Sequence, residues 1–254
     1  MFDLRLHPDT LTDADLVTLQ TFGVRAVLAA PAASEGPLTA QRVLEDFDHL
    51  LDVQLPRLAR AGLRAHAMLG VPGAALPRRG LAEVLQALPA LFRGGTVRAI
   101  GPLGLGGNAA PAHADALLEQ LALARTLRLP SVVLTPARAR ERATRRTLEL
   151  LKRSRLAPAT VAVEGATAAT LPLILGQGHH ACLCLHPDAL RAEKVPALVT
   201  RHGPERLLLS SAAGAGAADL VAIPRALHLL ARSGLSKPVV AAVGQRTAER
   251  FLGL

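Results

Sequence analysis

Aromatic residues are nearly absent from this sequence of 254 residues, which contains five Phe and neither Tyr nor Trp. Proteins that bind single-stranded nucleic acid stack bases on aromatic side chains, so this class is not favoured. The interior must be filled by Leu, Val, Ile and Ala instead. Packing of this kind is typical of helices laid on a parallel sheet.

Cysteine is also scarce, since Cys182 and Cys184 are the two in the chain. A pair two residues apart cannot staple a chain of this length, which indicates a reducing, cytoplasmic setting. A single C-x-C lacks the second ligand pair of a structural zinc site, so core packing is the favoured interpretation. No apolar run approaches the roughly 20 residues of a membrane span. Asp3 follows no apolar run, so no N-terminal signal is expected.

Strand-like and helix-like segments alternate along the whole chain. The expected strands cover residues 1–7, 24–29, 63–70, 96–101, 131–135, 160–164, 181–185 and 206–210. The expected helices between and after them cover residues 11–22, 39–61, 81–92, 112–127, 144–154, 171–175 and 189–201, and two more close the chain. Eight such units predict an α/β protein with one (β/α)8 TIM-barrel domain over residues 1–254. A doubly wound open sheet would need a glycine-rich phosphate loop after the first strand, and that loop is missing.

The first strand ends in a polar row. Because strand side chains alternate between two faces, we expect Asp3, Arg5 and His7 on one face and the apolar residues 2, 4 and 6 on the other. Active sites of such barrels lie at the carboxyl ends of the strands. Those ends carry the remaining candidates Thr135, Arg138, Glu164, His186, Ser210 and Ser211.

The same strand ends carry recognisable segments, FDLRLH, GPLGLGG, LPSVVLTP, VAVEGAT, LCLHPDAL and RLLLSSAAGAG. With them the chain resembles the TatD-like metal-dependent hydrolases of the amidohydrolase-like superfamily over its whole length. The resemblance implies a barrel with two divalent metals such as Zn, Mn or Mg. Those metals would activate water to attack phosphoester or related bonds.

The resemblance also assigns the metal-ligand positions one by one. His7 is the one position that keeps a ligand residue. The others are Arg5 in place of a histidine, Pro102 in place of a bridging glutamate, Leu134 and Gly165 in place of histidines, and Gly214 nearest the place of an aspartate. Aliphatic side chains offer no donor atoms to a metal, and Arg5 would repel a cation. We therefore expect no metal cofactor.

Several of these residues allow two interpretations. Arg5 and His7 form an anion pocket, or Arg5 pairs with Asp3 or Glu164 and fills the space that the metals would take. Glu164 is a general base or the counter-charge to Arg5. His186 lines the pocket or only caps a turn.

Thr135, Arg138, Ser210 and Ser211 stand where polar groups of a ligand would be met. Neither serine has an assignable acid or base partner, which disfavours a Ser-His-Asp hydrolase.

Three functional hypotheses follow. The first is a TatD-like barrel that has lost metal-dependent hydrolysis and binds a small anionic ligand or a protein partner. The second is a divergent hydrolase that uses His7, Glu164 and His186 with one metal. The third is nucleic-acid binding, which rests on the net charge of +9 and on the link of the family to nucleases. The sequence does not set the oligomeric state.

Overall fold

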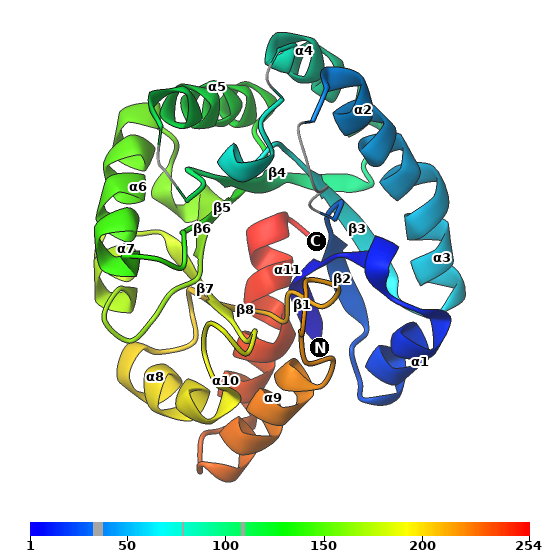
Figure 1. Cartoon of the computed structure of the whole chain (residues 1–254). Helices are drawn as coiled ribbons and strands as arrows, with labels where there is room; N and C mark the ends of the chain where they lie inside the picture. Colours follow the sequence, from blue (N-terminus) through cyan, green and yellow to red (C-terminus); the bar gives the residue numbers. More distant parts are fainter. Residues whose placement is uncertain (33–37, 78, 108–109) are drawn as a thin grey trace.

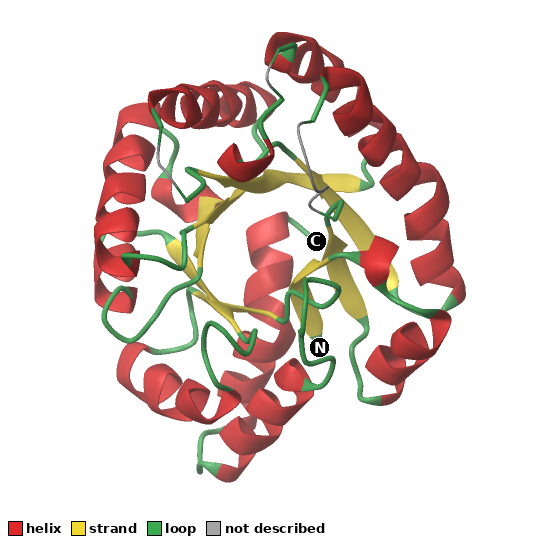
Figure 2. Ribbon diagram, in the orientation of Figure 1, coloured by secondary structure: helices red, strands yellow, loops and turns green. Residues whose placement is uncertain are grey.

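Eight parallel strands form one sheet that curls into a nearly closed barrel, and helices surround it (Figures 1 and 2). The computed structural model describes residues 1–32, 38–77, 79–107 and 110–254. Neighbouring strands pair in the order β1 to β8, so each strand lies beside the next in the chain. The predicted (β/α)8 TIM barrel is confirmed.

The strands lie close to their predicted positions. They are β1 (Phe2–Leu6), β2 (Ala26–Ala29), β3 (Arg64–Leu69), β4 (Val97–Gly104), β5 (Ser131–Leu134), β6 (Val161–Glu164), β7 (His180–Cys184) and β8 (Leu207–Ser210). The helices are α1 (Asp13–Thr21), α2 (Ala40–His49), α3 (Leu55–Arg60), α4 (Leu81–Leu91), α5 (Pro111–Leu127), α6 (Arg140–Ser154), α7 (Leu171–Gly176), α8 (Val195–His202), α9 (Ala222–Arg232), α10 (Lys237–Ala241) and α11 (Thr247–Leu252). Among the described residues, none of these helices has both the length and the apolar composition to cross a membrane.

Three helices differ from the sequence expectation. The predicted helix over residues 39–61 is α2 and α3 joined by a π-helical turn, Leu50–Gln54. Helix α6 begins at Arg140, earlier than predicted, because its N-cap Ala139 has a left-handed backbone and no capping side chain to mark it. Helix α8 begins only at Val195, with Pro196 in its first turn, where proline is favoured.

The interior of the barrel is an apolar cluster to which every strand contributes. It contains Phe2, Leu4, Ala26, Leu28, Ala30, Met68, Ala99, Val132, Ala162, Cys182 and Leu208, together with Ala248, Phe251 and Leu252 around α11. In Figure 1, α11 lies across the ring of strands. Side chains of the opposite parity pack outward against the helices in two larger clusters. Cys182 and Cys184 are buried free thiols, as core packing predicts.

Strand β1 carries a bulge, which makes strict alternation wrong for this strand. Asp3 pairs with Val27 and Leu6 with Ala29, so β1 has one extra residue between these pairs. Leu4 therefore still faces the interior cluster, whereas Leu6 packs in an outer cluster with residues of α1. Bulges of this kind re-aim side chains next to functional sites, and this one directs Arg5 into the mouth.

The ring closes between β8 and β1 through a carboxylate rather than through a regular ladder. Leu6 and Ala213 form an isolated bridge, and the His7 amide donates to the Ala213 carbonyl at 2.7 Å. Asp3 Oδ1 accepts the amide of Ser211 at 3.0 Å, and Asp3 Oδ2 accepts the Ser211 hydroxyl. The Ser211 Oγ in turn accepts the Ala213 amide at 2.9 Å. Burial raises the pKa of Asp3 to about 6, although these hydrogen bonds oppose the shift.

Substitution of Ser211 by Ala tests this closure. The change removes the hydroxyl that donates to Asp3 Oδ2 and accepts the Ala213 amide, while Asp3 Oδ1 keeps its bonds from the Ser211 and Arg5 amides. We expect the free energy of unfolding at pH 7, measured by urea titration, to fall by about 1–3 kcal/mol. As a control, Ser233→Ala removes an exposed hydroxyl that only caps its own helix, and it should change this value by less than about 0.5 kcal/mol. Equal losses in the two variants would contradict the closing role.

Candidate functional site at the barrel mouth

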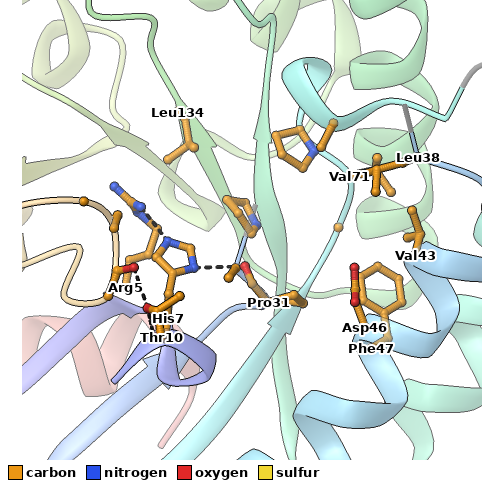
Figure 3. Close-up of a pocket in the computed structure, with 18 residues that line it drawn as sticks. Arg5, His7, Thr10, Pro31, Leu38, Val43, Asp46, Phe47, Val71 and Leu134 are labelled. Atoms are coloured by element: carbon orange, nitrogen blue, oxygen red, sulfur yellow. Dashed lines mark hydrogen bonds between the residues drawn. The ribbon is translucent and has the colours of Figure 1, made fainter. Parts of the chain in front are cut away.

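A cavity of about 450 Å³ opens at the carboxyl ends of the first five strands and beside the segment after β8. Arg5, His7 and Thr10 lie on one side of it, and Val43, Asp46 and Phe47 of α2 lie on the other (Figure 3). The remaining wall is mainly aliphatic and includes Leu38, Val71, Pro72, Ala75, Pro102 and Leu134. A second cavity of about 250 Å³ adjoins it and shares Arg5, Leu134 and Ala215.

Arg5 and Glu164 form an ion pair inside the mouth. Arg5 Nε lies 2.8 Å from Glu164 Oε1 and 3.0 Å from Oε2, and Nη2 lies 2.8 Å from Oε1. Burial alone would raise the pKa of Glu164, but the charge and hydrogen bonds of Arg5, with a bond from Ser210, hold it below its ordinary value. Of the two interpretations of Glu164, the structure places it as the counter-charge to Arg5.

His7 is held between a donor and an acceptor. A guanidinium can only donate, so the 2.8 Å contact with Arg5 Nη1 makes His7 Nε2 the acceptor. The 2.9 Å contact with the Pro31 carbonyl makes Nδ1 the donor. Burial and the neighbouring Arg5 charge lower the pKa of His7 to about 4. The ring is therefore neutral at pH 7, and both its nitrogens are engaged.

Thr135, His186 and Arg138 also lie at the mouth, away from the larger cavity. Thr135 and His186 line the second cavity, and Arg138 lines a third beside the loop after β5. The Thr135 hydroxyl donates to the Glu164 carbonyl at 2.7 Å. His186 Nε2 donates to the Ala215 carbonyl, and its Nδ1 accepts the amide of Asp188. The side chains of Thr135 and His186 thus form hydrogen bonds with backbone groups at the ends of neighbouring strands and loops.

Both candidate serines use their hydroxyls within the protein. Ser210 donates to Glu164 Oε1 at 2.8 Å, and Ser211 is part of the closure at Asp3. Each is almost completely buried. The two serines therefore stabilise the buried carboxylates of Glu164 and Asp3 and do not face a ligand.

The apolar wall of the cavity was missed by sequence reasoning. Val43 and Phe47 stand four residues apart in α2 and so share one helix face. This spacing marks them as buried, but it does not distinguish a helix face that packs on the barrel from one that lines its mouth. Arg140, which donates to the Gly165 carbonyl at 2.8 Å, was missed as well.

The residues at the expected metal positions meet in space but do not fit a metal. Arg5, His7, Pro102, Leu134 and Gly214 line the larger cavity, and Gly165 lines the second. Only His7 carries a donor type for a metal, and its one lone pair points at the Arg5 guanidinium. Within the described part of the chain, no three His, Cys, Asp or Glu side chains are grouped to hold a metal ion.

Two of these positions are also closed to a ligand side chain. A Cβ at Gly214 would collide with the carbonyl oxygen of His7. A Cβ at Gly165 would lie 2.7 Å from Thr135 Oγ1 and 3.1 Å from Arg140 Nη1. Both glycines have positive φ, +88° in each case, which a residue with a side chain rarely adopts. Neighbouring atoms therefore leave no room for a larger side chain at either glycine.

Comparison with known proteins agrees with the barrel fold. No protein-family model matches the chain. An uncharacterized metal-dependent hydrolase of Methanocaldococcus jannaschii is 24% identical over 255 residues, which cover 100% of both chains. The crystal structure of a TatD-like protein from Archaeoglobus fulgidus superposes with a TM-score of 0.84 at 24% identity and full coverage of both chains. The chain has a TatD-like fold.

A more distant structure shows the breadth of this TatD-like fold. The phosphotriesterase homology protein from Escherichia coli, whose structure holds phosphate in its active site, has a TM-score of 0.75 at 16% identity. The match covers 99% of this chain and 98% of that one. These similarities support the amidohydrolase-like architecture from end to end.

The pairing of Arg5 with Glu164 gives a second prediction. Arg5→Met leaves Glu164 buried without a counter-charge, which should lower the free energy of unfolding at pH 7 by about 3–5 kcal/mol. Adding Glu164→Gln removes that charge, so the double variant should recover much of the loss. The control pair Arg145–Glu141 is exposed on α6, and Arg145→Met should cost less than about 1 kcal/mol. If Arg5→Met is as mild as the control, the pair is not structural.

A third prediction concerns pH between 4 and 6.5. The lowered pKa of His7 means that its stabilising contribution is complete above pH 6.5 and is lost as pH falls towards 4. The raised pKa of Asp3 has the opposite sign, with stability present below pH 3.8 and lost as pH rises through 6. His180, whose pKa is also lowered to about 4, adds to the His7 slope in every variant.

We therefore expect Asp3→Asn to gain stability with rising pH more steeply than the wild type, and His7→Gln to gain it less steeply. Urea unfolding at intervals of pH across this window measures both slopes. If the free energy of unfolding changed with pH equally in all three proteins, the pKa shifts of Asp3 and His7 would be wrong.

Proposed function

We propose that this protein binds a small ligand in the mouth of a TatD-like barrel and does not carry out two-metal hydrolysis. The observation that carries the proposal is the position of the Arg5 guanidinium. The guanidinium forms an ion pair with Glu164 and donates a hydrogen bond to the lone pair of His7 Nε2. Arg5 also stands at a position that the resemblance assigns to a metal ligand. A divalent cation at this place would meet a fixed positive charge in a buried setting.

The cavity beside Arg5 supports the binding part of the proposal. Its volume of about 450 Å³ is within the range of small-molecule sites. Aliphatic walls from several strand ends and from α2 enclose it, with Arg5, His7 and Thr10 on one side and the paired Asp46 on the other. This combination of a mainly apolar lining and a few polar groups is the usual composition of a ligand pocket.

A divergent metal-dependent hydrolase is the second candidate, because the likeness to TatD-like proteins and to the named archaeal hydrolase spans the full chain. In that case His7, Glu164 and His186 would need to hold one metal. Each would first have to leave its present partner: Arg5 for His7 and Glu164, and Ala215 with Asp188 for His186.

Metal content separates the two candidates and is the fourth prediction. The protein is produced in medium with added zinc and manganese, freed of any metal-binding tag, and measured by elemental analysis. We expect far less than one ion per chain, and no turnover of phosphomonoester, phosphodiester or lactone substrates with either metal added. Near-stoichiometric metal that disappears in His7→Ala would overturn the proposal in favour of the hydrolase.

A further inference from the structure

The charges around the larger cavity are already paired. Resting on the proposed function, we infer that its ligand is an uncharged, mainly apolar small molecule that carries one hydrogen-bond acceptor. Arg5 is neutralised by Glu164 at 2.8 Å. Asp46, on the facing wall, pairs with Arg42 Nη2 at 2.9 Å. His7 is neutral because both its partners fix the uncharged ring.

An anion at this place would therefore gain little. Even at the N–H of Arg5 Nη1 that has no acceptor among the described residues, an anion would place a second negative charge near Glu164, whose three short contacts already balance the guanidinium. It would also share the cavity with the carboxylate of Asp46. A cation would instead face Arg5. A neutral molecule avoids all of these costs, since no charge has to be stripped of water or of its partner.

The apolar walls of the cavity favour a ligand whose surface is mainly apolar. Leu38, Val43, Phe47, Val71 and Leu134 present aliphatic and aromatic surface towards the cavity (Figure 3). Burial of apolar ligand surface here contributes roughly 25 cal/mol for each Å² removed from water. Arg5, His7 and Thr10 form a polar edge on one side, and the Asp46 carboxylate, paired with Arg42, lies on the facing wall.

One donor at that edge is free for the acceptor. Nε and Nη2 of Arg5 donate to Glu164, and Nη2 also lies 3.8 Å from Cys184 Sγ. One N–H of Nη1 donates to His7. The second N–H of Nη1 has no acceptor among the described residues. The Thr10 hydroxyl is engaged by the carbonyl of Gly214 at 2.6 Å. A ketone or amide carbonyl placed against Arg5 would complete the hydrogen bonding of the guanidinium.

A matched set of probes tests the inference: benzamide, benzoate, benzylamine, toluene and inorganic phosphate. The first four share a phenyl ring and differ in charge or in hydrogen-bonding group, and phosphate is a small anion without apolar surface. Binding is measured by ligand-observed NMR and by the shift in melting temperature. We expect benzamide to bind, toluene to bind more weakly, and benzoate to bind at least roughly tenfold more weakly than benzamide, since its carboxylate would lose water beside Glu164 and Asp46 without gaining an unpaired counter-charge.

A cavity-filling variant locates the binding. Ala75 is half-buried and lines this cavity, whereas its neighbour Ala74 is exposed and lines the cavity beside the β5 loop. Ala75→Phe should abolish benzamide binding, and Ala74→Phe should preserve it. In the wild type, nuclear Overhauser effects should join the benzamide ring to the methyl groups of Val43 and Val71, which needs no variant to fold.

The outcomes distinguish this inference from the function on which it rests. If benzoate or phosphate binds as tightly as benzamide and Ala75→Phe blocks it, the mouth still binds ligands but the neutral class is wrong. If benzamide binds without contact to Val43 and Val71 and without dependence on Ala75, the inferred site is wrong. If no probe gives binding that depends on Ala75, the inference and the proposed ligand-binding function both fail.

Discussion

The ion pair between Arg5 and Glu164 sets the conditions for the rest of the mouth. A buried carboxylate on β6 must have a counter-charge, because an uncompensated ion in the barrel would cost several kcal/mol. The bulge in β1 lets Arg5 reach across the interior to meet it. The Ser210 hydroxyl on β8 donates a further hydrogen bond to Oε1 of Glu164. Once the guanidinium is fixed, His7 can only accept from it, and its tautomer follows.

Arg5 of the same pair stands at a position that the resemblance to TatD-like proteins assigns to a metal ligand. The barrel superposes on a TatD-like structure along its whole length, and the positions that the resemblance assigns to metal ligands hold Arg5, His7, Pro102, Leu134 and two glycines. Function is a property of such sites and not of the architecture that carries them. In this chain the mouth is a concave pocket, and its polar groups Arg5, Glu164 and His7 bind one another.

Much of the architecture could be read from the sequence, because strands and helices of distinct apolar patterns alternate along it. Glu164 as partner of Arg5 was also within reach, since both stand at strand ends that converge. The bulge was not, because an extra residue in β1 leaves no trace in the pattern and is decided by pairing with β2. The early start of α6 was hidden for a similar reason, because Ala139 is not a capping residue. The roles of Ser210 and Ser211 depend on contacts more than 40 positions away in the chain.

Closure of the ring through Asp3 has a consequence for the order in which the chain assembles. The carboxylate and its Ser211 partner are separated by 208 positions, so this joint has one of the longest loops that a chain of this size can form. Contacts of such sequence separation are slow to form. During synthesis β1 would leave the ribosome long before β8 has been made, and the edge of β1 that faces β8 would stay unpaired until then. The barrel can become a ring only after Ser211 and Ala213 have been made.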